Sequence, residues 1–184
     1  MIENDAMLLK AARDGDESSF QVLYHRYRTP VFRFAWRLTG SIPAAEDVLQ
    51  ECFLALIGGA SFDADRGSLR AYLFGIARNL ALKRVRTAER ECGDLEEAEA
   101  ELNPLEDLLS AERSDAVARA VSSLPLRQRE ALILFEYEEL SLEEIAEATE
   151  SEIGAVKARL HRARESLRIC LAPFMPVHAV GRQL

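Results

Sequence analysis

Residues 141–168, SLEEIAEATESEIGAVKARLHRARESLR, carry the clearest structural pattern in the chain. Ser141 and Glu144 have the spacing of a capping box and predict a short helix over 141–149. A break at 151–154 follows, and a longer helix is predicted over 152–171. Its apolar residues recur at steps of three and four and predict one buried stripe: Ile153, Val156, Leu160, Ala163 and Leu167.

The longer helix carries a basic face beside its apolar stripe. Lys157, His161, Arg164 and Arg168 follow one another at steps of four, three and four, and Arg159 and Arg162 flank them. A short helix, a tight turn and a basic helix make up a helix-turn-helix, whose second helix fits the DNA major groove. A solvated basic helix packed on an acidic neighbour is the alternative reading.

Outward from this stretch the whole chain is predicted to be helical, because apolar residues recur with helical spacing and no segment alternates convincingly at period two. The expected helices span about 17–39, 43–57, 68–88, 106–123 and 126–137. In the helix over 68–88 the inward residues are expected to be Leu69, Leu73, Ile76 and Leu80.

Charge divides the chain into parts. Residues 1–90 carry a net charge of +2, residues 91–112 have nine acidic and no basic side chains, and residues 113–184 carry −1. Together with the helical spacing, this division predicts an all-α fold. It consists of two small helical domains, 1–90 and 113–171, joined by a flexible acidic linker, 91–112. Residues 172–184 are expected to form a frayed tail.

Cysteine usage and hydropathy indicate a cytoplasmic protein. The three cysteines are widely spaced, so a disulfide framework or zinc site is not expected; Cys52 and Cys170 are predicted in the core, and Cys92 lies among charges. The longest nearly apolar stretch, residues 52–60, is too short to span a membrane, and the acidic N-terminus does not resemble a signal peptide. No phosphate loop, metal pair or nucleophile–base set is found, so neither an enzyme nor a cofactor is expected.

A second candidate surface lies on the helix over 68–88. One stripe combines an aromatic, an amide and three cations: Tyr72, Asn79, Lys83, Arg86 and Arg90. Cations hold phosphates, amides read base edges and aromatics stack on unpaired bases. The preceding loop, residues 65–68, could help to hold a base extruded from the duplex. A solvated helix face is the alternative.

A third surface lies on AEDVLQECFLAL, residues 45–56, where Glu46, Asp47, Gln50 and Glu51 oppose the apolar side. By itself this pattern favours a solvated acidic face over a partner-binding surface.

Three stretches in register carry a family resemblance. Residues 45–56 resemble region 2.2 of the bacterial extracytoplasmic-function sigma factors, GSLRAYLFGIARNLALKRVR (67–86) resembles their regions 2.3 and 2.4, and residues 124–168 resemble region 4. The resemblance implies a region 2 domain and a region 4 domain. It implies core RNA polymerase, promoter DNA and an anti-sigma factor as partners, no catalysis, and no insertion into a membrane.

The resemblance also implies roles for individual residues. Core polymerase binding falls on Asp47, Leu49, Gln50, Glu51 and Phe53. Contact with the −10 element falls on Arg66, Ser68, Arg70, Tyr72, Arg78, Asn79, Lys83 and Arg86. Contact with the −35 element falls on Ser151, Ala155, Lys157, Arg159, His161 and Arg162.

The chain departs from the family pattern at several positions. Tyr72 replaces a tryptophan, Glu150 replaces the turn glycine, Glu152 replaces a small residue or proline, and Ala155 and Ala158 replace hydroxyl residues. Two other functions therefore stay open: a sigma-like decoy that titrates an anti-sigma factor, and a separate regulator with a helix-turn-helix.

Overall fold

The computed structural model describes residues 4–59, 62–64, 67–91 and 108–174. Within these ranges the protein is all-α, as predicted, and contains no strand. The helices are α1 (Asp5–Arg13), α2 (Glu17–Thr39), α3 (Ile42–Ile57), α4 (Leu69–Glu91), α5 (Leu108–Ser122), α6 (Leu126–Leu132), α7 (Leu142–Ala148) and α8 (Ile153–Leu171). A π-helical turn, η1 (Ile133–Tyr137), follows α6, and a 3₁₀ turn, η2 (Ala172–Phe174), follows α8.

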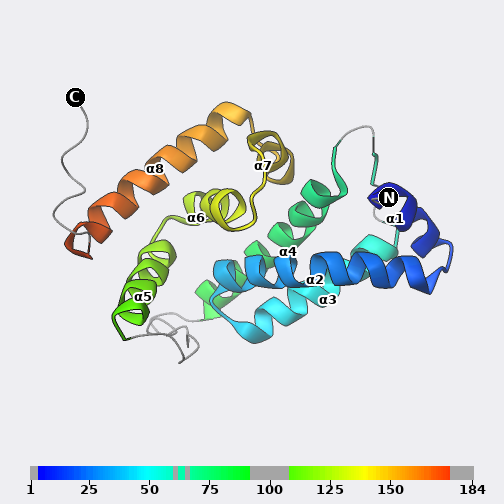
Figure 1. The fold of residues 1–184 in the computed structure, drawn as a ribbon, viewed down its shortest axis with the longest axis horizontal. Coiled ribbons are helices and arrows are strands. Elements are labelled where there is room, and N and C mark those ends of the chain that lie inside the picture. The colour runs from blue at the N-terminus through cyan, green and yellow to red at the C-terminus, as the bar shows by residue number, and fades with distance from the viewer. Residues whose placement is uncertain (1–3, 60–61, 65–66, 92–107, 175–184) are drawn as a thin grey trace.

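Helices α1–α4 form the N-terminal unit. In Figure 1, α2 and α3 run side by side and α4 crosses behind them. Asp16 caps α2, and Ser41 caps α3 by accepting a hydrogen bond from the Ala44 amide. The rings of Phe34 and Phe74 meet edge to face at 5.5 Å in the core, so α2 and α4 are held together by a buried aromatic pair.

Helices α5–α8 form the C-terminal unit, with α8 packed across α6 and α7. The predicted capping box is present: Ser141 Oγ accepts from the Glu144 amide, and the Glu144 carboxylate accepts from the Ser141 amide. Val156, Leu160 and Ala163 are buried as predicted. Ile153 and Leu167 are only half-buried, because they lie toward the ends of the helix.

The predicted single α-helix over 126–137 is wrong in its second half. After α6 the backbone widens into η1, where the Glu138 amide donates to the carbonyl of Ile133, five residues earlier, at 3.1 Å. The wider turn changes the direction in which Tyr137 and Glu138 leave the helix. Hydrophobic spacing is similar for both helix types, so the sequence pattern does not distinguish them.

Two further burial predictions need correction. On α4, Ile76 and Leu80 are half-buried, whereas Phe74, Ala77 and Ala81 are fully buried, because α4 is covered by α2 and α3 on one side and by α7 on another. Cys52 is buried as expected. Cys170 is exposed, because the last turn of α8 extends past the apolar stripe of that helix.

The two units pack directly on each other. Helix α7 lies against α4 (Figure 1). Buried side chains of both units form one continuous core cluster. At the closest approach, a Cβ placed on Gly75 of α4 would lie 3.5 Å from the carbonyl oxygen of Ala148 on α7. Most of the predicted linker (92–107), Cys92 and the tail beyond residue 174 lie outside the described residues.

Candidate nucleic-acid interface

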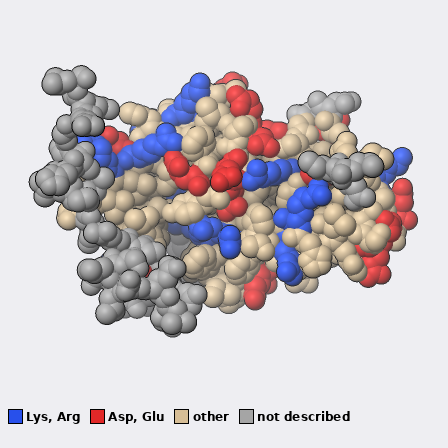
Figure 2. All heavy atoms as spheres, viewed as in Figure 1, with Lys and Arg blue, Asp and Glu red and all other residues tan. Residues whose placement is uncertain are grey.

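The first half of α8 presents the basic face that the sequence predicts. Lys157, His161 and Arg162 are exposed, and basic side chains follow the edge of the molecule formed by α8 in Figure 2. Arg159 is half-buried, and its guanidinium donates to Ser151 Oγ at 3.0 Å. The turn before α8 is therefore tied to the helix by two of the predicted −35 residues.

The turn before α8 has an unusual backbone. Glu150, which stands where the family has glycine, adopts φ +48°, in the left-handed region. Glu152 is the N-cap residue of α8, and its side chain makes no capping hydrogen bond. Ala155 is half-buried on the first turn of the helix. The turn keeps the shape of a helix-turn-helix at a cost in backbone strain, because only glycine adopts this conformation freely.

Three predicted side chains of α4 are accessible. Asn79, Lys83 and Arg86 are exposed along the helix at steps of four and three. Tyr72, one turn from the helix start, is half-buried and packs against the ring of Phe62 at 5.4 Å between centroids. Burial raises the pKa of the Tyr72 hydroxyl, which stays protonated at neutral pH. The arrangement offers an aromatic edge and polar side chains suited to an unpaired strand.

Arg78, predicted for the same surface, points inward. Its Nε and Nη2 donate to the two carboxylate oxygens of Glu130 at 2.8 and 3.2 Å, and its Nη1 donates to Asn79 Oδ1 at 3.1 Å. Both partners of this ion pair are buried, with Arg78 only 7% exposed and Glu130 fully enclosed. In this conformation Arg78 is not accessible to a nucleic acid, and its role there stays a prediction.

Two more predicted −10 residues also face the C-terminal unit. Ser68 Oγ donates to the Glu144 carboxylate at 2.8 Å, and the Arg70 guanidinium donates to the carbonyl of Glu138. Arg66 lies outside the described residues. The structure therefore divides the predicted −10 set into an accessible group on α4 and a group in contact with α6, α7 and the residue after η1.

The acidic face of α3 is formed as predicted. Asp47, Gln50 and Glu51 are exposed, whereas Leu49 is half-buried. Phe53 is buried under Phe20 and Tyr24, with its ring 6.2 and 5.0 Å from theirs, so it supports the face from below.

Arg84 belongs to this face and was not predicted. From α4 its Nη2 lies 2.7 Å from Glu51 Oε1 and 3.6 Å from Asp47 Oδ2. The sequence contains no local signal for the contact, because Arg84 and Glu51 are 33 residues apart.

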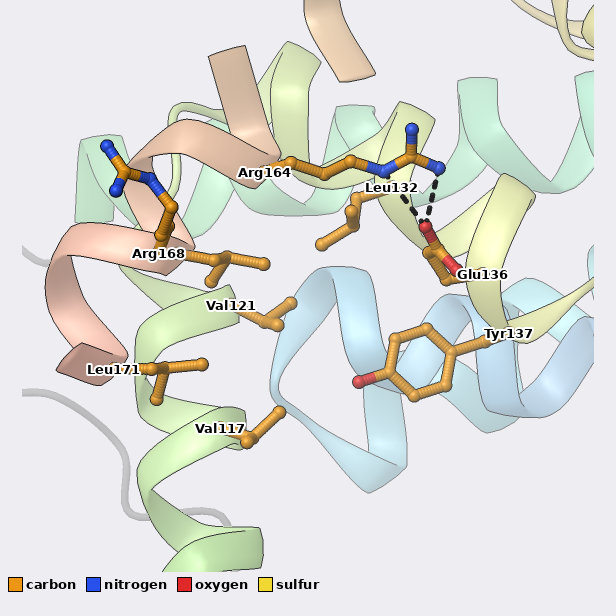
Figure 3. A pocket seen from close by; sticks show the side chains of 9 residues that line it. Val117, Val121, Leu132, Glu136, Tyr137, Arg164, Arg168 and Leu171 are labelled. Atoms are coloured by element: carbon orange, nitrogen blue, oxygen red, sulfur yellow. Dashed lines mark hydrogen bonds and ion pairs between the residues drawn. The ribbon is translucent and has the colours of Figure 1, made fainter. Parts of the chain in front are cut away.

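An apolar groove on the C-terminal unit was also not predicted. Figure 3 shows Val117 and Val121 of α5 facing Leu171 of α8, with Tyr137 and Arg164 at the sides. The groove has a volume of about 320 Å³. Arg164 donates twice to Glu136 at its rim, at 2.8 and 3.2 Å. An apolar floor with charged edges is a surface that suits an amphipathic helix.

The part of the chain that the structure describes contains no cluster of three or more His, Cys, Asp or Glu side chains arranged to hold a metal ion. None of the described helices is long and apolar enough to cross a membrane.

Two family models match the chain and define the class of protein. Sigma-70 region 2 matches residues 23–91, and Sigma-70 region 4 matches residues 114–167. The fold is thus that of a sigma factor with regions 2 and 4.

Comparison with individual relatives identifies the family of sigma factors to which the chain belongs. The chain is 31% identical to the ECF RNA polymerase sigma factor SigW of Bacillus subtilis, over 87% of this chain and 92% of that protein. It is 32% identical to the ECF RNA polymerase sigma-E factor of Escherichia coli, over 93% and 96%. The sigma factor RpoE of Bartonella quintana, solved in complex with the anti-sigma factor NepR, superposes with a TM-score of 0.70 at 28% identity, over 89% and 98%. The chain belongs to the extracytoplasmic-function family of sigma factors, and it is an alternative sigma factor that directs transcription initiation.

Proposed function

We propose that this sigma factor reads a −35 element through α8 and a −10 element through α4, while α3 binds core RNA polymerase. The observation that carries the proposal is the placement of three chemically distinct exposed faces on three separate helices. The face of α8 is basic, the face of α4 combines cations with an amide and an aromatic, and the face of α3 is acidic. These faces coincide with the segments that match regions 2 and 4.

In the proposed −35 contact, Lys157, His161 and Arg162 approach DNA directly from the exposed side of α8. Arg159 and Ser151 hold the turn through their mutual hydrogen bond and are placed to reach the phosphate backbone, with Ala155 at the helix start. Exposed cations near the beginning of a helix suit the major groove, where they meet phosphates and guanine edges.

In the proposed −10 contact, Asn79 reads a base edge and Lys83 and Arg86 hold phosphates of the same strand. Tyr72, supported by Phe62, offers a stacking surface for an unpaired base. Arg66, Ser68, Arg70 and Arg78 complete the proposed set.

In the proposed polymerase contact, the exposed acids Asp47 and Glu51 and the amide of Gln50 face the partner, and Leu49 and Phe53 provide apolar support. Opposite charge across such a surface favours rapid and specific association.

The proposed domain bounds are 1–90 and 113–171, with the acidic segment 91–112 as the connection and 172–184 as a tail. The residues between α4 and α5, 92–107, can extend to about 50 Å at ~3.3 Å per residue, which is more than one turn of DNA.

The proposed cellular setting follows from the same function. The protein acts in the cytoplasm, without catalysis and without a cofactor of its own. An anti-sigma factor is proposed as its inhibitor, since the Bartonella quintana sigma factor with the same fold was solved with one bound.

Run-off transcription tests the proposal. The protein is added to bacterial core RNA polymerase with a library of promoter fragments, beside the variants Asn79→Ala and Arg162→Ala. Transcripts from a defined subset of fragments, lost in both variants, are the expected result. Arg168→Ala is the matched control, because Arg168 lies at the far end of α8 and pairs with Glu165 at 2.6 Å.

Two negative results of this assay would have different meanings. Binding to core without transcripts from any fragment would support the decoy. Absence of core binding would overturn the proposed function.

A further inference from the structure

Hydrogen bonds fix the turn immediately before Glu152. Ser151 Oγ donates to the carbonyl of Thr149 at 3.0 Å and accepts from the Arg159 guanidinium at 3.0 Å. The Ser151 amide donates to the carbonyl of Ala146 at 2.9 Å. Bonds from both α7 and α8 therefore hold Ser151, and the position of the next residue is set with it.

Glu152 is anchored through its backbone, whereas its side chain is exposed. Its carbonyl accepts from the amides of Ala155 and Val156 at 2.9 and 3.1 Å. The capping side chains of α2 and α3, Asp16 and Ser41, bond to the first amides of their own helices, but the Glu152 carboxylate makes no such bond. Within the described ranges no cation forms an ion pair with this carboxylate. A fixed backbone thus presents an accessible acceptor at the start of α8.

We propose that Glu152 determines specificity in the −35 contact, where its carboxylate accepts a hydrogen bond from the amino group of a cytosine in the major groove. The proposal rests on the proposed contact of α8 with the −35 element and names one base that this element contains. It adds an acidic contact to a surface that was otherwise defined by the cations Lys157 and Arg162.

The chemistry of a carboxylate selects the base. An ionised carboxylate accepts hydrogen bonds and donates none. In the major groove guanine presents two acceptors, and thymine presents an acceptor and a methyl group, so neither base can pair with Glu152. Adenine presents its amino group beside the acceptor N7, whereas cytosine presents an amino group without that neighbour. Cytosine therefore fits Glu152 best, and guanine and thymine are rejected by repulsion between acceptors.

The position of Glu152 suits contact with a base edge. In a helix-turn-helix, residues at the beginning of the second helix reach the bases. Glu152 directly precedes Ile153, the first residue of α8. A Cβ placed on Gly154 would meet no atom of the described chain within 4 Å, so the surface beside Glu152 is open. The exposed ammonium group of Lys157 follows on the same helix, and its charge offsets repulsion between the carboxylate and DNA phosphates.

A carboxylate at this position also has effects that do not depend on the DNA sequence. A negative charge near the first turn stabilises a helix through its dipole, and the same charge repels phosphates. Both effects change the affinity for all DNA sequences by the same factor. Base preference therefore separates the proposed cytosine contact from the effects of charge alone.

The test measures base preference with the full chain in complex with core polymerase. The DNA is a library randomised across the −35 element, with the −10 element of a fragment that the run-off assay identifies, and the bound fraction is sequenced. The unaltered chain is expected to favour cytosine over thymine at one position by at least about fivefold, the lower end of the cost of a mismatched base pair. Glu152→Gln is expected to lose this preference and to favour adenine there, because an amide pairs with adenine N6 and N7.

Glu150→Gln is the matched control, because Glu150 is an exposed acid in the same turn and the substitution removes the same charge. It is expected to raise the affinity for all fragments equally and to leave the base preference unchanged. Three results would overturn the proposal: no preference for cytosine at any −35 position, the same preference in Glu152→Gln as in the unaltered chain, or the same change of preference in both variants.

Arg162→Ala in the same library separates this proposal from the function on which it rests. If the unaltered chain, Arg162→Ala and Glu152→Gln all bind without preference across the −35 element, α8 does not read that element, and the proposed −35 contact is lost. A −35 preference that depends on Arg162 and not on Glu152 keeps the proposed function and removes only the cytosine contact.

Discussion

Arg84 of α4 bridges Asp47 and Glu51 of α3, with its Nη2 2.7 Å from Glu51 and 3.6 Å from Asp47. Asp47 and Glu51 are about half exposed or more, whereas Arg84 is mostly covered. The proposed polymerase-binding face is therefore partly neutralised by a cation from its own chain. A basic partner has to compete with Arg84 for the same two carboxylates.

Arg84→Ala is expected to tighten binding to core polymerase by about two- to fivefold at low salt, because it frees both acids for the partner. The free energy of unfolding should change by less than about 1 kcal/mol, since both carboxylates of the pair are exposed to water and such ion pairs contribute little. A competition assay against labelled sigma factor measures the affinity. Glu51→Ala should weaken binding and cancel the gain in the double variant, and Glu143→Ala, at an exposed acid of α7, is the control. A loss of affinity in Arg84→Ala would show that Arg84 itself contacts the polymerase.

Glu150→Gly is expected to stabilise the protein by about 0.5–1 kcal/mol. Glu150 has φ +48°, where a side chain costs roughly 1–2 kcal/mol, and the greater freedom of glycine in the unfolded chain offsets part of the gain. Urea unfolding measures the change. Glu143→Gly, inside α7, should instead lose about 1 kcal/mol. Equal losses in both variants would contradict the strain at Glu150.

Stability is expected to depend on pH through Glu138. Burial raises the pKa of Glu138 above its ordinary value of 4.5, although Arg37, Arg70 and Arg33 act in the opposite direction. The folded chain therefore binds this proton more tightly than the unfolded chain does. The resulting contribution to stability is complete below pH 4.5 and is lost as pH rises through the folded-state pKa.

Urea unfolding of Glu138→Gln at several pH values checks this sign. The unfolding free energy of the unaltered chain should fall relative to that of the variant as pH rises from about 4.5 toward 7. Other acids, such as Asp16 and Glu165, whose pKa values are lowered by hydrogen bonds, affect both chains equally. A difference that grows in the opposite direction would mean that the surrounding arginines outweigh burial.

Lys157→Ala is expected to weaken binding to every promoter fragment that the protein transcribes. The negative slope of log affinity against log salt concentration should become shallower by about 1, because one phosphate contact is lost. Arg164→Ala should change the slope much less, since Arg164 is held by Glu136 and lies over the Phe135 ring. Anisotropy titrations with holoenzyme at several salt concentrations compare the two. Equal slopes for Lys157→Ala and the unaltered chain would remove Lys157 from the DNA contact.

Cys170 is expected to react with iodoacetamide in the folded protein, whereas Cys52 is not. Cys52 is fully buried, and burial raises the pKa of its thiol to about 12, so the reactive thiolate is almost absent at neutral pH. Mass spectrometry in a Cys92→Ser background should find one adduct, at Cys170. Cys170→Ser should remove it, and denaturant should restore modification at Cys52. Rapid labelling of Cys52 in the folded chain would contradict its burial.

The helices themselves were predictable because their signals are local. The capping box at Ser141 and the N-cap at Ser41 fix helix starts through neighbours three residues away. Helical periodicity likewise predicts that Lys157 and His161 share an exposed side of α8. The pattern did not distinguish the π-helical turn after Leu132, because both helix types place apolar residues at similar spacing.

The all-α class, the position of the helix-turn-helix and the three polar faces could be predicted from the sequence, since they depend on neighbours within about one helical turn. The contact of Arg78 with Glu130, 52 residues away, and the position of Cys170 outside the core depend on how the helices pack and could not be predicted. Burial and ion pairing depend on which helices meet. Here Glu130 of α6 covers Arg78 of α4, whereas Asn79 and Lys83 of the same helix stay exposed.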